Sequence, residues 1–373
     1  MIYLDNAATT LLKPVSVGRA VYTAMETCAS PGRGGHRPAM QAAELVFRCR
    51  ERAAALFHVP DPAQVVFTMN ATHALNLAIH SMAKRGTHVL ISGYEHNSVT
   101  RPLAQLGAEI RVAEAPVFDR TAQLEAFMRE LDWAELVICT MVSNVFGFIL
   151  PVKELAERCR EKSVPLIIDA SQAAGILDVN AESLGAAFVA MPGHKGLFGP
   201  QGTGLLLCNQ TGEPLISGGS GSDSILQQMP EYLPDRLEAG THNVPGIAGL
   251  LAGIEYVLET GTDTIAAHEE RLRRLLLEDL KDLPGLEVFA GESGSQSGVV
   301  SFRFCEMSCE EAAEKLAERG ICLRSGLHCA PYAHKSAGTL KTGTLRASFS
   351  PFVSEEMLRS ACGSIRELLQ TVA

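Results

Sequence analysis

Hydrophobic positions form short continuous runs through the first two-thirds of the chain. We expect buried strands over 64–70, 87–93, 135–144 and 165–171, because each run is mostly apolar and has a strand's length. Other segments show apolar residues at helical spacing, as in the amphipathic stretch 152–162. Continuous apolar strands that alternate with helices are typical of a mostly parallel sheet with both faces covered. The pattern therefore predicts an α/β fold.

The pattern changes after about Pro245. Two long helices are expected at 244–261 and 263–283. They are followed by a strand, a helix, a loop, a second strand and a final helix, over 297–304, 308–320, 323–335, 344–350 and from about Ser354. This order indicates a second, smaller α+β unit.

We therefore expect two domains. The large domain spans 16–245, and the small domain combines 1–15 with 246–373. The Gly-, Ser- and Pro-rich stretch 205–245 is expected to bridge the domains or to lie near an interface.

Composition and charge narrow the classes of function. The 373 residues carry a net charge of −10, and no basic run interleaves with aromatic residues, so we expect no nucleic-acid partner. The longest apolar stretch, 136–152, contains Ser143 and Asn144, which favours a buried strand plus loop over a membrane span. The N-terminus lacks the basic and apolar regions of a signal peptide. We expect a cytoplasmic protein with no membrane partner.

Ten cysteines are scattered along the chain without any C-x2-C pair, so no structural metal site is expected. Several lie in apolar runs, as buried thiols do. Cys329 differs, because "LRSGLHCAPYAHK" has the character of a loop. Taken alone, this stretch leaves Cys329 open as a metal ligand, half of a disulfide, a packed residue or a nucleophile.

Two charged residues suggest a cofactor. Lys195 lies in the glycine-rich stretch 190–208, which matches neither a P-loop nor G-x-G-x-x-G, and a surface turn residue is the simpler alternative. Asp169 ends an apolar strand, where α/β proteins bind ligands, although it is also suited to capping a helix. Pyridoxal phosphate needs a lysine for its aldehyde and a carboxylate for its ring nitrogen.

The phosphate and the ring of pyridoxal phosphate also need protein groups that bind them. The backbone amides of Ala71 and Thr72, with the Thr72 hydroxyl, open a helix and suit a phosphate, although simple N-capping by Asn70 or Thr72 explains the same residues. His96 follows another strand and is placed to stack on a cofactor ring and to relay a proton as a catalytic residue, although a lone histidine is more often a polar surface residue.

These pieces together resemble a known family. The chain is similar to class V aminotransferases, which are fold-type I pyridoxal-phosphate enzymes, and within them to cysteine desulfurases and selenocysteine lyases. The resemblance covers nearly the whole length and rests on "YLDNAATT", "SPGRGGHR", "NATHALN", "YEHNSV", "VSNVFG", "IIDASQAAG", "GHKGLFGPQGTG", "LEAGTHN", "RSGLHCAP" and "LRAS". It implies a seven-stranded, mostly parallel sheet flanked by helices, plus a smaller α+β domain.

The resemblance also implies roles for single residues. It assigns Lys195 to the Schiff base with the cofactor, Asp169 to the ring nitrogen, Gln172 to the ring hydroxyl and His96 to stacking. The phosphate would be held by Ala71, Thr72 and His194, and by Thr241 of a second subunit in a homodimer. Asn144 and Arg346 would bind the substrate, with Arg346 pairing with its carboxylate. Cys329 would be the nucleophile that takes sulfur from L-cysteine, aided by His328 or Arg324.

The resemblance leaves several questions. Pro192 replaces a serine that helps bind the phosphate in many relatives, and His242 replaces a proline. The short segment between Cys329 and Arg346 is typical of the branch that passes sulfur to a dedicated acceptor protein. The pathway stays open between iron–sulfur cluster assembly, thiolated RNA and selenium metabolism. A selenocysteine lyase and an aminotransferase or epimerase that does not use Cys329 remain alternatives. The roles of His334 and Lys335 stay open.

Overall fold

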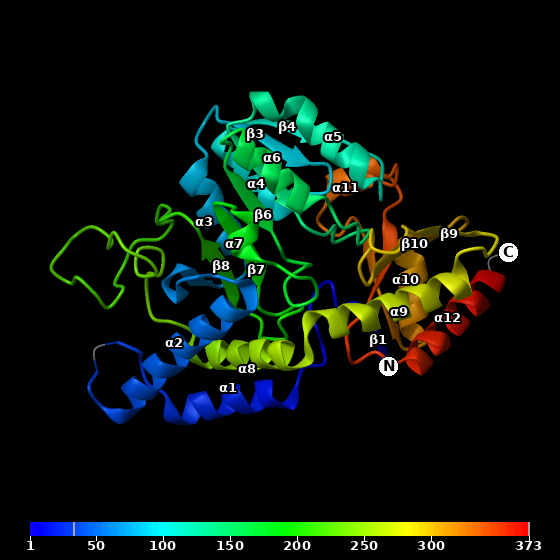
Figure 1. The fold of residues 1–373 in the computed structure, drawn as a ribbon. Coiled ribbons are helices and arrows are strands. Elements are labelled where there is room, and N and C mark those ends of the chain that lie inside the picture. The colour runs from blue at the N-terminus through cyan, green and yellow to red at the C-terminus, as the bar shows by residue number, and fades with distance from the viewer. Residues whose placement is uncertain (33, 372–373) are drawn as a thin grey trace.

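A seven-stranded sheet forms the centre of the computed structural model, which describes residues 1–32 and 34–371 (Figure 1). Arg33, in the "SPGRGGHR" stretch, lies outside the described residues. The strand order is β2-β8-β7-β6-β5-β3-β4, and only β8 runs against its neighbours. The strands are β2 (Val65–Thr68), β3 (His88–Ser92), β4 (Glu109–Ala113), β5 (Leu136–Thr140), β6 (Leu166–Asp169), β7 (Phe188–Pro192) and β8 (Gly204–Cys208).

The four strands expected from the apolar runs are confirmed as β2, β3, β5 and β6. The expected run 135–144 forms a strand only to Thr140, and the chain then turns through Ser143 and Asn144. The edge strand β4 escaped prediction because it has exposed and half-buried positions and no apolar run.

Helices cover both faces of this sheet (Figure 1). Alternate residues of β5 separate the two cores, because side chains along a strand point to opposite faces. Val137 and Cys139 pack with α2, α5, α6 and α8, whereas Leu136 and Ile138 pack with α3 and α4. These helices are α2 (Arg37–Phe57), α3 (Ala71–Met82), α4 (Asn97–Leu106), α5 (Arg120–Glu130), α6 (Val152–Glu161) and α8 (Val244–Thr260), with α1 (Val15–Thr27) against α8 and the short α7 (Ala181–Leu184) beside α6.

A smaller unit follows α8. Its four-stranded sheet has the order β12-β13-β10-β9, and a separate parallel pair joins β1 to β11. The strands are β1 (Ile2–Tyr3), β9 (Leu286–Phe289), β10 (Val299–Phe304), β11 (Ile321–Cys322), β12 (Arg324–Gly326) and β13 (Thr344–Ser348). The helices are α9 (Thr262–Leu280), α10 (Cys309–Glu318), α11 (Pro331–Ser336) and α12 (Glu355–Gln370), and α9, α10 and α12 share one apolar core with the strands.

Packing places α8 with the larger unit. Val244, Ile247 and Leu250 lie in the core beneath the seven-stranded sheet, and α8 contacts both α1 and α2. We therefore propose that the chain divides near Gly261, between α8 and α9, rather than after Pro245.

The N-terminal segment 5–10 connects the two units. Asn6 and Ala7 donate hydrogen bonds to the carbonyl and hydroxyl of Ser348, at 2.9 and 2.8 Å. A few residues on, the backbone N–H of Thr10 donates to the His194 carbonyl at 3.2 Å. None of the helices within 1–32 and 34–371 combines the length and apolar character needed to cross a bilayer.

Gly253 tests how tightly α8 packs against the turn after Lys195. A Cβ atom at Gly253 would lie 2.1 Å from the Leu197 carbonyl oxygen. We expect Gly253→Ala to destabilise the larger unit by about 2 kcal/mol, because overpacking against backbone outweighs alanine's better helix propensity. Differential scanning calorimetry measures the corresponding fall in melting temperature.

Gly363→Ala in α12 is the matched control, because a Cβ there meets nothing within 4 Å. It should leave the protein unchanged or stabilise it by up to about 1 kcal/mol. Equal effects of the two substitutions would contradict the packing argument.

Candidate active site

A cavity of about 200 Å³ lies where β5, β6 and β7 end and α3 begins. The smaller unit closes its other side with residues of β12, β13 and the loop after β12. Ligands of α/β proteins bind at this carboxyl edge of the strands. The cavity gathers every predicted site residue except Thr241: Lys195, Asp169, Gln172, His96, Ala71, Thr72, His194, Asn144, Arg346 and Cys329.

Lys195 and Asp169 both line the cavity. Asp169 is the last residue of β6 and is 3% exposed; its Oδ1 accepts the N–H of Ser171 at 2.9 Å. Burial lowers the pKa of Lys195 to about 8, and the Asp169 carboxylate opposes that shift. The lysine thus has an amine that exchanges a proton near neutral pH.

The start of α3 offers free backbone donors. Asn70 caps the helix by accepting the N–H of His73 at 2.9 Å, so N-capping by Asn70 is confirmed. Capping does not use the first two N–H groups of the helix. Within the described residues the N–H groups of Ala71 and Thr72 have no protein acceptor. They line the cavity and, with the helix dipole, suit an anion.

Ser98 connects two of the predicted residues. Its hydroxyl lies 2.8 Å from Oγ1 of Thr72 and 2.9 Å from Nδ1 of His96, which also accepts the Ser98 N–H. Burial lowers the pKa of His96 to about 4, so its imidazole is neutral at pH 7. Ser98 was missed in the sequence, although it lies within the "YEHNSV" motif.

His194 and Gln172 are held by the N-terminal segment. His194 Nδ1 lies 3.0 Å from the Thr9 hydroxyl, and burial lowers the pKa of His194 to about 4. The Gln172 side-chain amide donates to the Ala7 carbonyl at 2.9 Å. Pro192, the last residue of β7, is buried and lines the same cavity, so the departure noted in the sequence lies beside the predicted phosphate site.

The smaller unit supplies two arginines from paired strands. Arg324 in β12 and Arg346 in β13 are cross-strand partners, and both reach the cavity. The Arg346 Nη1 donates to the Asn144 carbonyl at 2.9 Å, and Nη2 pairs with Asp5 at 2.7 Å. The Asn144 amide in turn donates to the His328 carbonyl at 2.7 Å.

Cys329 is exposed and lies at the wall of the cavity. Its φ of 58° and the 48° of His328 form a left-handed turn after β12, and Asn97 donates its N–H to the Cys329 carbonyl at 2.8 Å. The nearest cation is Arg324, whose Nη2 lies 3.8 Å from Sγ. A cation beside a sulfur stabilises its anionic form, which is the nucleophilic one.

Of the two neighbours expected to aid Cys329, the structure favours Arg324 over His328. The His328 ring is buried with Nε2 3.2 Å from the Thr344 carbonyl, and burial next to Arg346 lowers its pKa to about 2. A neutral imidazole has no charge with which to stabilise a thiolate.

The structure shows the contacts of His334 and Lys335, whose roles stay open in the sequence. The His334 ring is buried, bonded to Thr339 at 2.7 Å and stacked on His328, whereas exposed Lys335 pairs with Glu114 at 2.5 Å. Within the described chain no three metal-ligating side chains converge.

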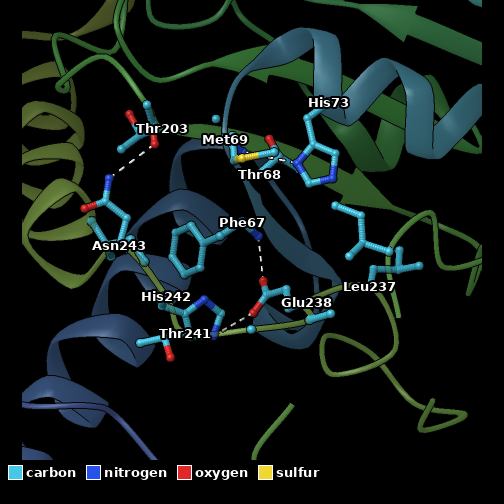
Figure 2. Close-up of a pocket in the computed structure, with 16 residues that line it drawn as sticks. Phe67, Thr68, Met69, His73, Thr203, Leu237, Glu238, Thr241, His242 and Asn243 are labelled. Atoms are coloured by element: carbon cyan, nitrogen blue, oxygen red, sulfur yellow. Dashed lines mark hydrogen bonds and ion pairs between the residues drawn. The ribbon is translucent and has the colours of Figure 1, made fainter. Parts of the chain in front are cut away.

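Thr241 lies outside this cavity. It lines a separate pocket of about 190 Å³, in which Figure 2 shows the His242 ring turned toward Glu238 and the Thr241 side chain directed the other way. His242 Nε2 lies 3.1 Å from Glu238, which also forms a buried ion pair with Arg50. Glu238 therefore anchors the segment that carries Thr241.

Comparison with known proteins identifies the family. The family model for aminotransferase class-V matches residues 2–359. The chain belongs to the class-V aminotransferase family. Probable cysteine desulfurases from Methanothermobacter thermautotrophicus and Pyrococcus abyssi are each 32% identical to it, covering 98% and 100% of this chain and 94% and 95% of theirs.

Solved structures agree on the fold. The apo cysteine desulfurase from Thermococcus onnurineus NA1 has a TM-score of 0.90 at 31% identity, covering 99% of this chain and 95% of its own. The S-sulfonic acid form of a cysteine desulfurase from Escherichia coli has a TM-score of 0.86 at 25% identity, covering 100% of this chain and 95% of its own. The predicted family and α/β fold of this member of the class-V aminotransferase family are confirmed.

Arg324→Gln tests which neighbour activates Cys329. We expect the alkylation of Cys329 by iodoacetamide at pH 7 to slow several-fold, because the cation beside Sγ is lost. His328→Gln, followed by mass spectrometry of the same peptide, should leave the rate nearly unchanged; a larger effect there would contradict the assignment.

Lys195→Gln tests the environment of the amine in cofactor-free protein. The folded pKa of about 8 lies below the unfolded value of 10.5, so the unfolded state binds more protons between these values. Wild-type stability relative to Lys195→Gln should therefore rise from pH 8 to 10.5, by no more than about 3 kcal/mol. Chemical denaturation at several pH values measures this, and a flat or falling difference would refute it.

Proposed function

We propose that this protein is a cysteine desulfurase that moves sulfur from L-cysteine to Cys329. The observation that carries the proposal is the presence of Lys195, Arg346 and Cys329 around one cavity. A lysine amine, a carboxylate anchor and a reachable thiol are the three groups that this chemistry requires. The desulfurase names of the relatives agree with it.

The cavity fits pyridoxal phosphate as cofactor. Asp169 presents a buried carboxylate for a protonated ring nitrogen, and Lys195 presents an amine for the aldehyde. The free amides of Ala71 and Thr72 fit the phosphate, beside the hydroxyl of Thr72 and the ring of His194. Gln172 and neutral His96 line the space for the ring. When bound, this cofactor supplies an electron sink for charge that develops at the substrate α-carbon.

Each protein group then has a task. Arg346 and Asn144 bind and orient the amino acid. Lys195, with its lowered pKa, takes the proton from the α-carbon and later returns one to the product. The Cys329 thiolate attacks the substrate sulfur, an S–S bond forms as the C–S bond breaks, and the substrate carbon takes up a proton. The products are L-alanine and a persulfide on Cys329.

The position of Cys329 favours transfer to another protein. Its side chain is exposed, yet it lies on a short turn after β12 rather than on a long loop. A thiol on so short a turn has little reach, so we propose that a sulfur-acceptor protein docks there. Cytoplasmic iron–sulfur cluster assembly is the pathway we propose for the sulfur.

Thr241 is the one expected phosphate-binding residue that needs a second copy of the chain. Thr241 lies away from the cavity of its own chain and lines a further hollow together with Phe47 of α2, a large apolar side chain that is exposed. We propose a homodimer in which Thr241 of each chain contributes to the phosphate site of the other.

A selenocysteine lyase is the second candidate, because the same residues serve a selenium-containing substrate. The ratio of kcat/KM for L-selenocysteine and L-cysteine decides between them. An aminotransferase or epimerase leaves the exposed thiol beside Arg324 without a task, and that observation disfavours it.

Cys329→Ser provides the main test. We expect production of L-alanine and sulfide from L-cysteine with a reductant to fall by about 100-fold or more, because the attacking sulfur is lost. The visible absorbance of bound cofactor should persist, since Cys329 holds none of its groups.

Cys305→Ser is the matched control, because Cys305 is also exposed but is absent from the lining of the cavity. Full alanine production by Cys329→Ser would reject the nucleophile. Loss of the absorbance only in Lys195→Ala would confirm the cofactor lysine.

A further inference from the structure

We propose that Asp5 is a positioning residue that holds Arg346 ready for the carboxylate of the substrate. This inference rests on the proposed function, in which Arg346 binds that carboxylate. It concerns a residue that lies outside the cavity lining and acts through another side chain.

Arg346 is almost completely buried, and its charge needs a partner. Its side chain is 1% exposed, whereas that of Asp5 is 21% exposed. The Asp5 Oδ1 accepts a hydrogen bond from Nη2 at 2.7 Å, and the Asn144 carbonyl accepts one from Nη1 at 2.9 Å. The two acceptors fix the plane of the guanidinium from the side of the protein. A buried guanidinium without such a partner would be costly.

Arg346 has unused donors, because each of Nη1 and Nη2 has a second N–H and Nε has one. Its Nε is buried and has no hydrogen-bond partner among the described residues. A carboxylate binds arginine best through two parallel N–H groups, so an incoming substrate meets a side chain with unused donors and a preset plane. Asp5 therefore reduces the ordering that substrate binding has to impose.

The backbone around Asp5 is itself held firmly. Asp5 forms a bridge with Ser348 on β13, the strand that carries Arg346, and its carbonyl accepts the N–H of Ala8 at 3.1 Å. The next residues along the chain bond to Ser348 and His194, as described above. The Asp5 carboxylate is thus fixed relative to both the arginine and the turn that carries Lys195.

The experiment compares Asp5→Asn and Asp5→Ala in the full-length enzyme loaded with pyridoxal phosphate. The probes are L-cysteine for turnover, L-alanine for binding seen in the cofactor absorbance, and cysteamine, which lacks the carboxylate, as an inhibitor. Asp5→Ala should raise KM for L-cysteine and Kd for L-alanine by about 10-fold or more, as loss of a charge-assisted hydrogen bond predicts. The kcat should stay within about twofold, because only binding is affected.

Asp5→Asn keeps an acceptor oxygen and should lie between wild type and Asp5→Ala. The inhibition constant of cysteamine should not change in either variant. Asp132→Ala is the matched control, since Asp132 forms an exposed ion pair with Lys162 at the same 2.7 Å distance. It should leave all constants at their wild-type values.

An unchanged Kd for L-alanine in Asp5→Ala would overturn the proposal. Equal weakening of L-alanine and cysteamine binding would also overturn it, because the substitution would then disturb the whole site rather than carboxylate binding. If Asp5→Ala does not fold, the Kd for L-alanine and the inhibition constant of cysteamine are compared in Asp5→Asn instead. We then expect a several-fold rise in the Kd for L-alanine alone. A wild-type enzyme that binds L-alanine but makes none from L-cysteine would refute the desulfurase function and leave the Asp5 comparison valid.

Discussion

The parallel pairing of β5, β6 and β7 is the constraint on which the site depends. Thr140 is the register partner of Asp169, and Asp169 is the partner of Ala190, so the three strands end at one edge of the sheet. Glu95 strengthens this edge, because its buried carboxyl accepts hydrogen bonds from the Thr140 N–H and the Ser92 hydroxyl. Burial raises the pKa of Glu95 to about 8, which favours the uncharged form of this carboxyl beside Asp169.

Burial at this edge lowers the pKa values of three bases by different amounts. It lowers the pKa of Lys195 to about 8 and those of His96 and His194 to about 4. Because desolvation penalises the charged form of each base, the lysine becomes able to exchange a proton while the histidines stay neutral. One physical cause thus produces an amine that exchanges a proton near neutral pH and two uncharged imidazoles, as the proposed roles of these residues require.

Cys329 and Arg346, the proposed nucleophile and carboxylate anchor, come from the other unit. Pairing of β12 with β13 brings Arg324 and Arg346 side by side, and the left-handed turn at His328 and Cys329 returns the thiol to Arg324. The N-terminal segment then joins the two halves through Ser348 and His194. The site therefore forms only when both units and this segment are in place.

The sequence by itself determined the α/β class, the buried strands and the positions of Lys195 and Asp169, because these depend on local hydrophobic periods and on the residues at which a strand ends. Its motifs also located Cys329. Tertiary structure decided the rest: that Arg324 rather than His328 faces the thiol, that Asp5 holds Arg346, and that α8 packs with the larger sheet. These are contacts between residues far apart in the chain, and neither spacing nor composition encodes which side of a turn a ring occupies. His328 and Cys329 are adjacent, yet the first is buried and the second is exposed, because the packing around the turn between them covers only one of the two.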